Sequence, residues 1–101
     1  MKLMTKEIER KMPPLGATEK TAPEDKQVIT KYFSPWSCWT WYVLEGEKKG
    51  NDWIFFGYVE GLDAEYGYFR LSELESVKGP FGLRIERDLY APDRLPIGDH
   101  A

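Results

Sequence analysis

The feature that most constrains the fold is the alternation of large aromatic and apolar side chains along the middle of the chain. From residue 27 to residue 71 the hydrophobic pattern has a period of two, which is typical of β-strands. Trp39, Trp41 and Val43 fall on one face of such a strand, and Thr40 and Tyr42 fall on the other. Four stretches are predicted as strands: residues 27–33, 38–45, 53–60 and 66–71. The connections between them are short and contain Gly, Pro or charged residues, which favours antiparallel hairpins.

Two short helices and an edge strand complete the predicted fold. Thr5 can cap a helix over residues 6–12, which Pro13-Pro14 ends. Ser72-Glu73-Leu74-Glu75 fits a capping box for a second helix that reaches about Lys78. Leu83 to Tyr90 alternates again and favours a last edge strand, and residues 91–101 read as a loosely ordered tail. The sequence predicts one α+β domain over 1–101, an antiparallel sheet of four to five strands with one or two short helices packed on it.

Composition restricts the compartment and the class of partner. The chain has 14 Lys and Arg against 17 Asp and Glu, with the two signs interspersed, so no basic stripe is present to bind duplex DNA. A single cysteine permits no internal disulfide. The N-terminus lacks the apolar segment of a signal peptide. The longest apolar run, Trp53 to Val59, is too short to cross a bilayer. We therefore predict a cytoplasmic protein without membrane contact.

A set of strings spread along the chain resembles a known family. The strings include Pro13-Pro14-Leu15, Trp39-Thr40-Trp41-Tyr42, Phe55-Phe56-Gly57-Tyr58-Val59, Gly67-Tyr68-Phe69 and Ile85-Glu86-Arg87-Asp88-Leu89-Tyr90. Together they are similar to the small bacterial proteins grouped as domain of unknown function 2958, from about Leu3 to Tyr90. The resemblance implies a bacterial protein of the kind found on mobile elements such as plasmids. It implies no activity and supplies no catalytic residues.

Nucleophilic catalysis finds little support in the sequence. Cys38 needs a base, and the only histidine, His100, lies far along the chain at its C-terminal end. A thiol within an aromatic strand is more often a packed core residue, and we predict that role for Cys38. We predict no catalytic residue, no metal ligand and no cofactor.

Carboxylates provide one alternative function. Glu60, Asp63 and Glu65 surround a single turn, and Glu86 and Asp88 share one strand face. Oxygen ligands of this kind suit Mg²⁺. A small metal-dependent hydrolase or nuclease is therefore an alternative, although solvated acids on a loop are the commoner reading.

Single-stranded nucleic acid provides a second alternative. Aromatic rings on a sheet can stack bases, and Lys31, Lys48, Lys49 and Arg70 could supply positive charge. The RNA-recognition sequence pattern is absent, and acidic residues are as plentiful as basic ones. Nucleic acid is possible as a partner but is not favoured.

The leading prediction is a non-catalytic protein-interaction module. Each predicted helix is about 10 Å long, so the two helices can cover one face of the sheet and leave the other to loops or to a partner. We expect a partner on the exposed face, either another protein or a second copy of the chain. Trp39 and Trp41 are the predicted exposed pair because tryptophan is enriched at interface hot spots. Tyr58 and Arg87 are the further candidate binding residues, and Arg87 is also expected to pair with a carboxylate inside the domain.

Overall fold

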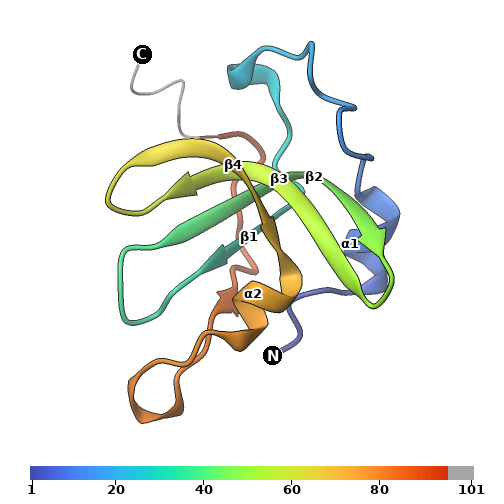
Figure 1. The fold of residues 1–101 in the computed structure, drawn as a ribbon. Helices are drawn as coiled ribbons and strands as arrows, with labels where there is room; N and C mark the ends of the chain where they lie inside the picture. The colour runs from blue at the N-terminus through green and yellow to red at the C-terminus, as the bar shows by residue number, and fades with distance from the viewer. Residues whose placement is uncertain (96–101) are drawn as a thin grey trace.

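The computed structural model describes residues 1–95 as a five-stranded antiparallel sheet with two short α-helices (Figure 1). The strands lie in the order β4-β3-β2-β1-β5, so the first four follow one another as neighbours and β5 adds to the far side of β1. The strands are β1 (Thr30–Phe33), β2 (Thr40–Lys49), β3 (Asp52–Glu60), β4 (Ala64–Arg70) and β5 (Glu86–Arg87). The helices are α1 (Lys6–Lys11) and α2 (Leu71–Ser76), and the 3-10 turns are η1 (Pro23–Asp25) and η2 (Pro80–Gly82). The predicted α+β class is confirmed.

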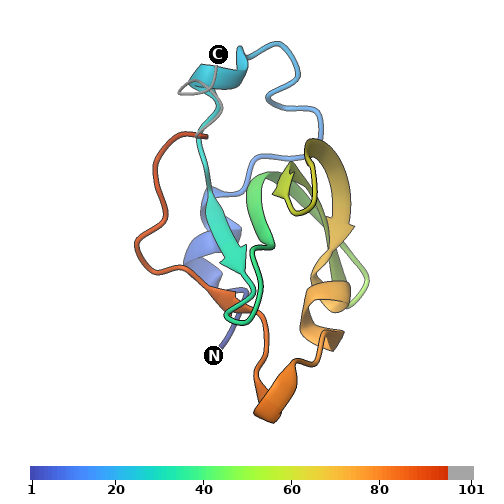
Figure 2. The ribbon, with the colours of Figure 1, turned by 90° about the vertical axis from the view of Figure 1, so that its left-hand side faces the viewer.

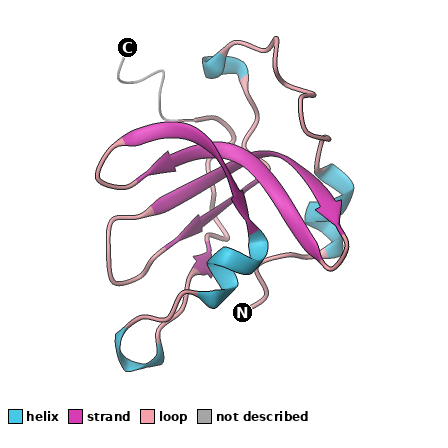
Figure 3. Ribbon diagram, viewed as in Figure 1, coloured by secondary structure: helices cyan, strands magenta, loops and turns pink. Residues whose placement is uncertain are grey.

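Helix α2 and the residues that flank α1 pack on one face of the sheet, which we call the helical face. Its buried centre is formed by side chains from all four long strands: Tyr32, Val43, Phe55 and Phe69. Leu71 and Leu74 of α2 cover it, together with Leu3 before α1. The Tyr32 hydroxyl donates a hydrogen bond of 2.6 Å to the Leu3 carbonyl, which fixes the N-terminal segment against the sheet. Figure 3 shows the long strands twisting strongly between the two helices.

The opposite face, which we call the tyrosine face, is covered by segments without helices. Its buried side chains include Tyr42, Leu44 and Tyr58. Leu95 packs on them, and the Val28 amide donates to the Asp93 carbonyl at 2.9 Å. Figure 2 shows the segment after β5 running along the molecule from the α2 end toward η1. Loops and a partner were the two covers predicted for the face without helices, and within the described residues extended segments and loops cover much of it. A partner on the part that stays exposed remains a prediction.

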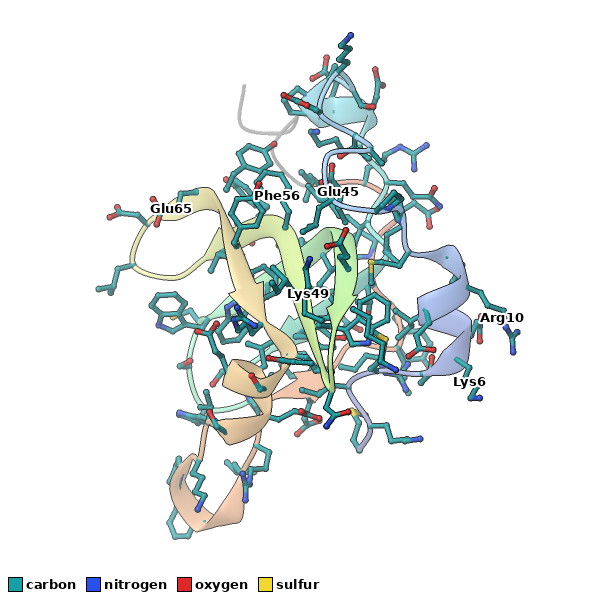
Figure 4. All side chains as sticks on the ribbon, turned by 45° about the vertical axis from the view of Figure 1, so that its right-hand side comes forward. Lys6, Arg10, Glu45, Lys49, Phe56 and Glu65 are labelled. Atoms are coloured by element: carbon teal, nitrogen blue, oxygen red, sulfur yellow. The ribbon has the colours of Figure 1, made fainter. Side chains whose placement is uncertain are left out.

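A β-bulge in β2 is the reason that the loop of residues 13–26 lies over the tyrosine face. The register shifts between Val43 and Glu45, so the side chain of Glu45 is buried next to Phe56 on β3 (Figure 4). The Glu45 carboxylate accepts hydrogen bonds from the amides of Gly16 at 2.7 Å and Thr18 at 2.8 Å, and from the Thr18 hydroxyl. A buried charge is tolerated only when it is paired or hydrogen-bonded. Here the loop supplies those bonds and is held in place by them.

The helix termini agree only partly with the predicted caps. The Thr5 hydroxyl accepts from the Ile8 amide at 3.2 Å, as predicted for α1. Helix α2 begins two residues earlier than the Ser72 box predicted, because Glu73 accepts from the Arg70 amide at 3.0 Å. Ser72 instead bonds to the Asp52 carboxylate of the β2–β3 hairpin through its amide at 3.0 Å and its hydroxyl at 2.7 Å. The hydrogen bond from Ser72 is the main cause that lowers the pKa of Asp52.

Several predicted boundaries are corrected by the structure. Strand β1 begins at Thr30 rather than at Gln27, and β5 has two residues rather than the stretch from 83 to 90. Of the predicted loose tail, Leu95 is buried and Arg94 forms a bridge with Gln27, so residues 91–95 belong to the fold. Residues 96–101 of that tail lie outside the described residues. No helix within the described range is long and apolar enough to span a membrane.

Candidate functional site

Three tryptophans surround a surface hollow at the end of the helical face, and we call it the tryptophan pocket. Its volume is about 330 Å³. The lining residues come from the β1–β2 connection, from β2 and from the segment between α2 and β5: Ser34, Trp36, Ser37, Trp39, Trp41, Val77 and Ile85. None of these side chains carries a charge. The pocket is therefore an uncharged, mostly apolar surface.

Trp39 and Trp41 form the outer wall of the tryptophan pocket. Their rings are stacked, with centroids 6.0 Å apart and an interplanar angle of 26°. The Trp39 side chain lies against Gly61 in the β3–β4 turn, where an added Cβ would come within 2.5 Å of the indole ring. Glycine at 61 is thus required for Trp39 to pack there. Trp39 nevertheless remains 41% exposed.

Trp36 forms the inner wall and connects the pocket to the next loop. Its indole lies on Gly79, where a Cβ would come within 2.6 Å of the ring. Trp36 also packs against the helical-face core. The close approach of ring and backbone holds the loop between α2 and β5 beside the pocket.

Ser34 provides the polar group of the pocket. It is buried, and its hydroxyl has no hydrogen-bond partner in the part of the chain that the structure describes. A buried hydroxyl without a partner costs free energy that a bound acceptor or donor can recover. The Ser34 hydroxyl is therefore a buried polar group, unpaired within residues 1–95, among the lining residues.

The loop between α2 and β5 also carries an aromatic side chain away from the body. Phe81 in η2 is fully exposed and has a left-handed backbone conformation, with φ 57° and ψ 28°. Such a conformation is strained for a residue with a Cβ. The base of the loop is held by the hydrogen bond from the Gly79 amide to the Leu83 carbonyl at 2.8 Å. Figure 3 shows η2 at the tip of this protruding loop.

The structure brings two of the four predicted binding residues together and separates the other two. Trp39 and Trp41 share the tryptophan pocket. Tyr58 lies on the tyrosine face, buried against Tyr42, with ring centroids 6.3 Å apart. Burial raises the pKa of Tyr42 to about 12, and the nearby Glu60 carboxylate also raises this pKa.

Arg87 lies in β5, away from the tryptophan pocket. Its Nε donates to the Lys2 carbonyl at 3.1 Å. The expected ion pair is wrong for residues 1–95, where no carboxylate lies within pairing distance of Arg87. Asp88, the neighbouring acid, pairs instead with Lys31 at 3.3 Å.

Cys38 and the carboxylates differ from the predicted arrangement. Cys38 is exposed in the loop before β2, so its predicted role as a packed strand residue is wrong. The Ser34 amide donates to the Trp39 carbonyl at 3.0 Å, which closes the loop and leaves Cys38 outside the strand. Within residues 1–95 no three His, Cys, Asp or Glu side chains gather as metal ligands. His100 lies outside the described residues.

Most of the residues that line the pocket were not predicted from the sequence. Trp36 lies in the connection after the predicted strand 27–33, and Val77 and Ile85 come from segments far along the chain. Only the spacing of Trp39 and Trp41 pointed to a shared surface. The glycines at 61 and 79 beside turns were the remaining signal, because close approach of a ring to the backbone requires them.

The fold and the pocket define a small α+β domain with a partly exposed tryptophan surface, and its described residues hold no group of three or more possible metal ligands. The chain belongs to the family described as "Protein of unknown function (DUF2958)", whose model matches residues 3–101. The predicted family is confirmed. No curated protein and no solved structure shows a significant match to the chain.

Proposed function

We propose that the chain is a protein-interaction module whose tryptophan pocket binds an uncharged, apolar segment of another protein. The observation that carries the proposal is the partly exposed Trp39, stacked on Trp41 at the edge of a hollow of about 330 Å³ without charged lining. Tryptophan contributes more than most residues to interface affinity, because it buries a large rigid surface in one contact.

The chemistry of the lining favours the main chain and apolar side chains of a protein over other ligands. Indole N–H groups donate hydrogen bonds, and the Ser34 hydroxyl can donate or accept. A bound peptide offers carbonyl acceptors for these groups and apolar side chains for the rings. A nucleic acid requires cations beside the rings to meet its phosphates, and the lining of the tryptophan pocket has none.

The exposed side chain of Phe81 is evidence for a contact surface larger than the pocket itself. A wholly exposed phenylalanine in a left-handed conformation is unfavourable for solubility and for backbone energy. Strained positions of this kind concentrate at functional sites. The loop that carries Phe81 also supplies Val77 and Ile85 to the pocket, so one partner can contact all three.

The proposed compartment is the cytoplasm, where an exposed cysteine stays reduced. Cys38 is exposed and has no second cysteine to pair with. Such thiols are avoided in oxidising compartments, where they form intermolecular disulfides.

The test is selection of peptides from a displayed random library against the purified protein, followed by affinity measurement on the enriched sequences. We expect an uncharged, apolar consensus that quenches or shifts tryptophan fluorescence. Trp39→Ala should weaken binding by about 2 kcal/mol, or roughly thirtyfold. Leu62→Ala is the matched control, since Leu62 is 94% exposed in the β3–β4 turn beside Gly61 and outside the pocket lining.

Thermal melting of both variants separates loss of binding from loss of fold. Selected peptides that bind Trp39→Ala as tightly as the wild type, with both proteins folded, would show that the tryptophan pocket is not the binding site. Light scattering on the free protein distinguishes a second copy as the occupant, because a self-associated protein would already contain a filled pocket.

A further inference from the structure

A second hollow lies on the tyrosine face, on the other side of the sheet from the tryptophan pocket. Its volume is about 420 Å³, within the range of small-ligand sites. The loop of residues 16–26 forms one wall, and three aromatic side chains from β3 and β4 form the other: Phe56, Tyr66 and Tyr68. We call this hollow the aromatic groove.

The three rings present π-faces at an angle to one another. Phe56 and Tyr66 are nearly parallel, with centroids 5.9 Å apart and an interplanar angle of 7°. Tyr68 is tilted by 55° against Phe56 at 5.1 Å. Tyr68 is also 70% exposed, although it is in the middle of a strand. Two ring planes that meet at an angle form a corner in which one group can contact both.

Tyr66 adds a polar atom to this corner. Its hydroxyl is buried and has no hydrogen-bond partner among residues 1–95. Burial raises the pKa of Tyr66, and the neighbouring Tyr58 and Glu24 raise it further. The hydroxyl thus stays protonated and uncharged.

The loop that faces the rings is acidic. Residues 16–26 contain Glu19, Glu24 and Asp25 against Lys20 and Lys26, and Glu45 lies beneath the loop, which gives four acids and two bases. Lys26 lines the groove, but it is buried and its ammonium is bonded to the carbonyl and the hydroxyl of Thr18. Glu19 lines the groove and is exposed. A charged ligand in the groove therefore meets aromatic faces on one side and a net negative loop on the other.

We propose that the aromatic groove binds an organic cation, either a guanidinium or a substituted ammonium group. The negative faces of Tyr and Phe rings attract a cation placed over them. A substituted ammonium or a guanidinium is favoured over a hydrated Lys ammonium or a metal ion, because it loses less hydration when it enters an apolar corner. The Glu19 carboxylate and the net negative charge of the loop also attract a cation.

The same features count against two other occupants. A single-stranded oligonucleotide could stack a base on Tyr68, but its phosphates would face the acidic loop. A neutral apolar molecule would fit the rings but would gain nothing from Glu19. The groove is distinct from the proposed peptide site, because it uses side chains of the opposite face and a different loop.

The experiment is an NMR titration of the full chain that follows the amides of β3, β4 and the loop. The probes are choline, its uncharged analogue 3,3-dimethylbutan-1-ol, N-acetylarginine amide and a short oligothymidine, all at matched ionic strength. We expect choline or N-acetylarginine amide to shift signals around the groove, with the uncharged analogue weaker by about fivefold or more. A response to N-acetylarginine amide alone would assign the cation to a protein side chain, and a response to choline alone would assign it to a free small molecule.

Variants of the most exposed ring show where the cation binds. Tyr68→Ala should weaken binding by about fivefold or more, whereas Tyr68→Phe keeps the π-face and should bind nearly as the wild type does. Tyr90→Ala removes a tyrosine that is 91% exposed outside the groove and should change nothing. Measurable shifts of equal size from choline and its uncharged analogue would overturn the proposal. So would no shift from either cation, binding that survives in Tyr68→Ala, or binding of oligothymidine alone.

Discussion

Removing the buried carboxylate of Glu45 should release the loop of residues 13–26 from the sheet. Glu45 is 3% exposed and accepts three hydrogen bonds from Gly16 and Thr18. Hydrogen bonds to a charged group contribute about 1.5–3 kcal/mol each when both partners stay buried. The loop lies at the surface, so after the substitution its amides can turn to water and recover part of that loss.

We therefore expect Glu45→Ala to lower the free energy of unfolding by about 3 kcal/mol, between the cost of one such bond and that of all three. In a domain of this size that corresponds to a fall in melting temperature of roughly 12–24 °C. Glu47→Ala is the matched control on the same strand. Glu47 is partly exposed and, among residues 1–95, pairs only with Lys49, so its removal should cost less than about 1 kcal/mol.

The pH dependence of stability isolates the charge of Glu45. Burial alone would raise its pKa, but the hydrogen bonds from Thr18 and Gly16 outweigh burial and lower the pKa below the usual 4.5. A carboxyl whose pKa is lower in the folded state stabilises the fold above pH 4.5, and this contribution is lost as the pH falls through the folded-state pKa. Asp52 acts in the same direction, so the difference between wild type and Glu45→Gln is the quantity to measure.

Urea unfolding at pH 6.5 and at pH 3 provides that difference. We expect wild type to be more stable than Glu45→Gln at pH 6.5, with the gap narrowing at pH 3. A gap that stays constant with pH, or a Glu45→Ala variant within about 0.5 kcal/mol of wild type, would refute the role of the carboxylate in holding the loop.

Three further substitutions test other parts of the structure by thermal or urea unfolding. Tyr32→Phe removes the buried hydrogen bond to the Leu3 carbonyl and should cost about 1–2 kcal/mol; an unchanged stability would mean that the N-terminal segment is not held there. The free energy of unfolding of Cys38→Ser should stay within about 0.5 kcal/mol of the wild-type value, because the side chain is exposed; a larger loss would indicate that Cys38 is packed in the core. Phe81→Asn should raise stability by about 0.5–1 kcal/mol, since Asn tolerates a left-handed backbone; a loss of stability would indicate unrecognised packing of the phenyl ring.

The strands were predictable because their large side chains alternate, but the residues at which the strands end were not. Strand β2 continues to Lys49 through polar residues that pair with Asp52 and Trp53 across the hairpin, and backbone pairing of this kind needs no apolar pattern. Strand β5 is short because only Glu86 and Arg87 pair with β1. In both cases the partner strand, rather than the local sequence, decides where the strand ends.

The candidate sites were less predictable because they depend on register and on distant segments. The i, i+2 spacing placed Trp39 and Trp41 on one face, which the structure shows. Tyr58 lies on the other face because Trp41 pairs with Val59, and a register different by one residue would have reversed that assignment. The loop over the tyrosine face depends on Glu45, whose burial follows from a bulge that the alternation of residues 38–45 does not reveal.

The position of β5 in the sheet has a consequence for the order of folding. Strands β1 to β4 pair with their neighbours in sequence. Strand β5 instead pairs with β1, from which it is separated in sequence by β2 to β4, α2 and the Phe81 loop. Contacts between distant segments form late and tend to open first. We expect amide hydrogens of residues 77–88 to exchange with solvent at a lower opening free energy than those of β2 and β3. Val77 and Ile85 belong to this segment, so we expect this wall of the tryptophan pocket to open more readily than the central hairpins.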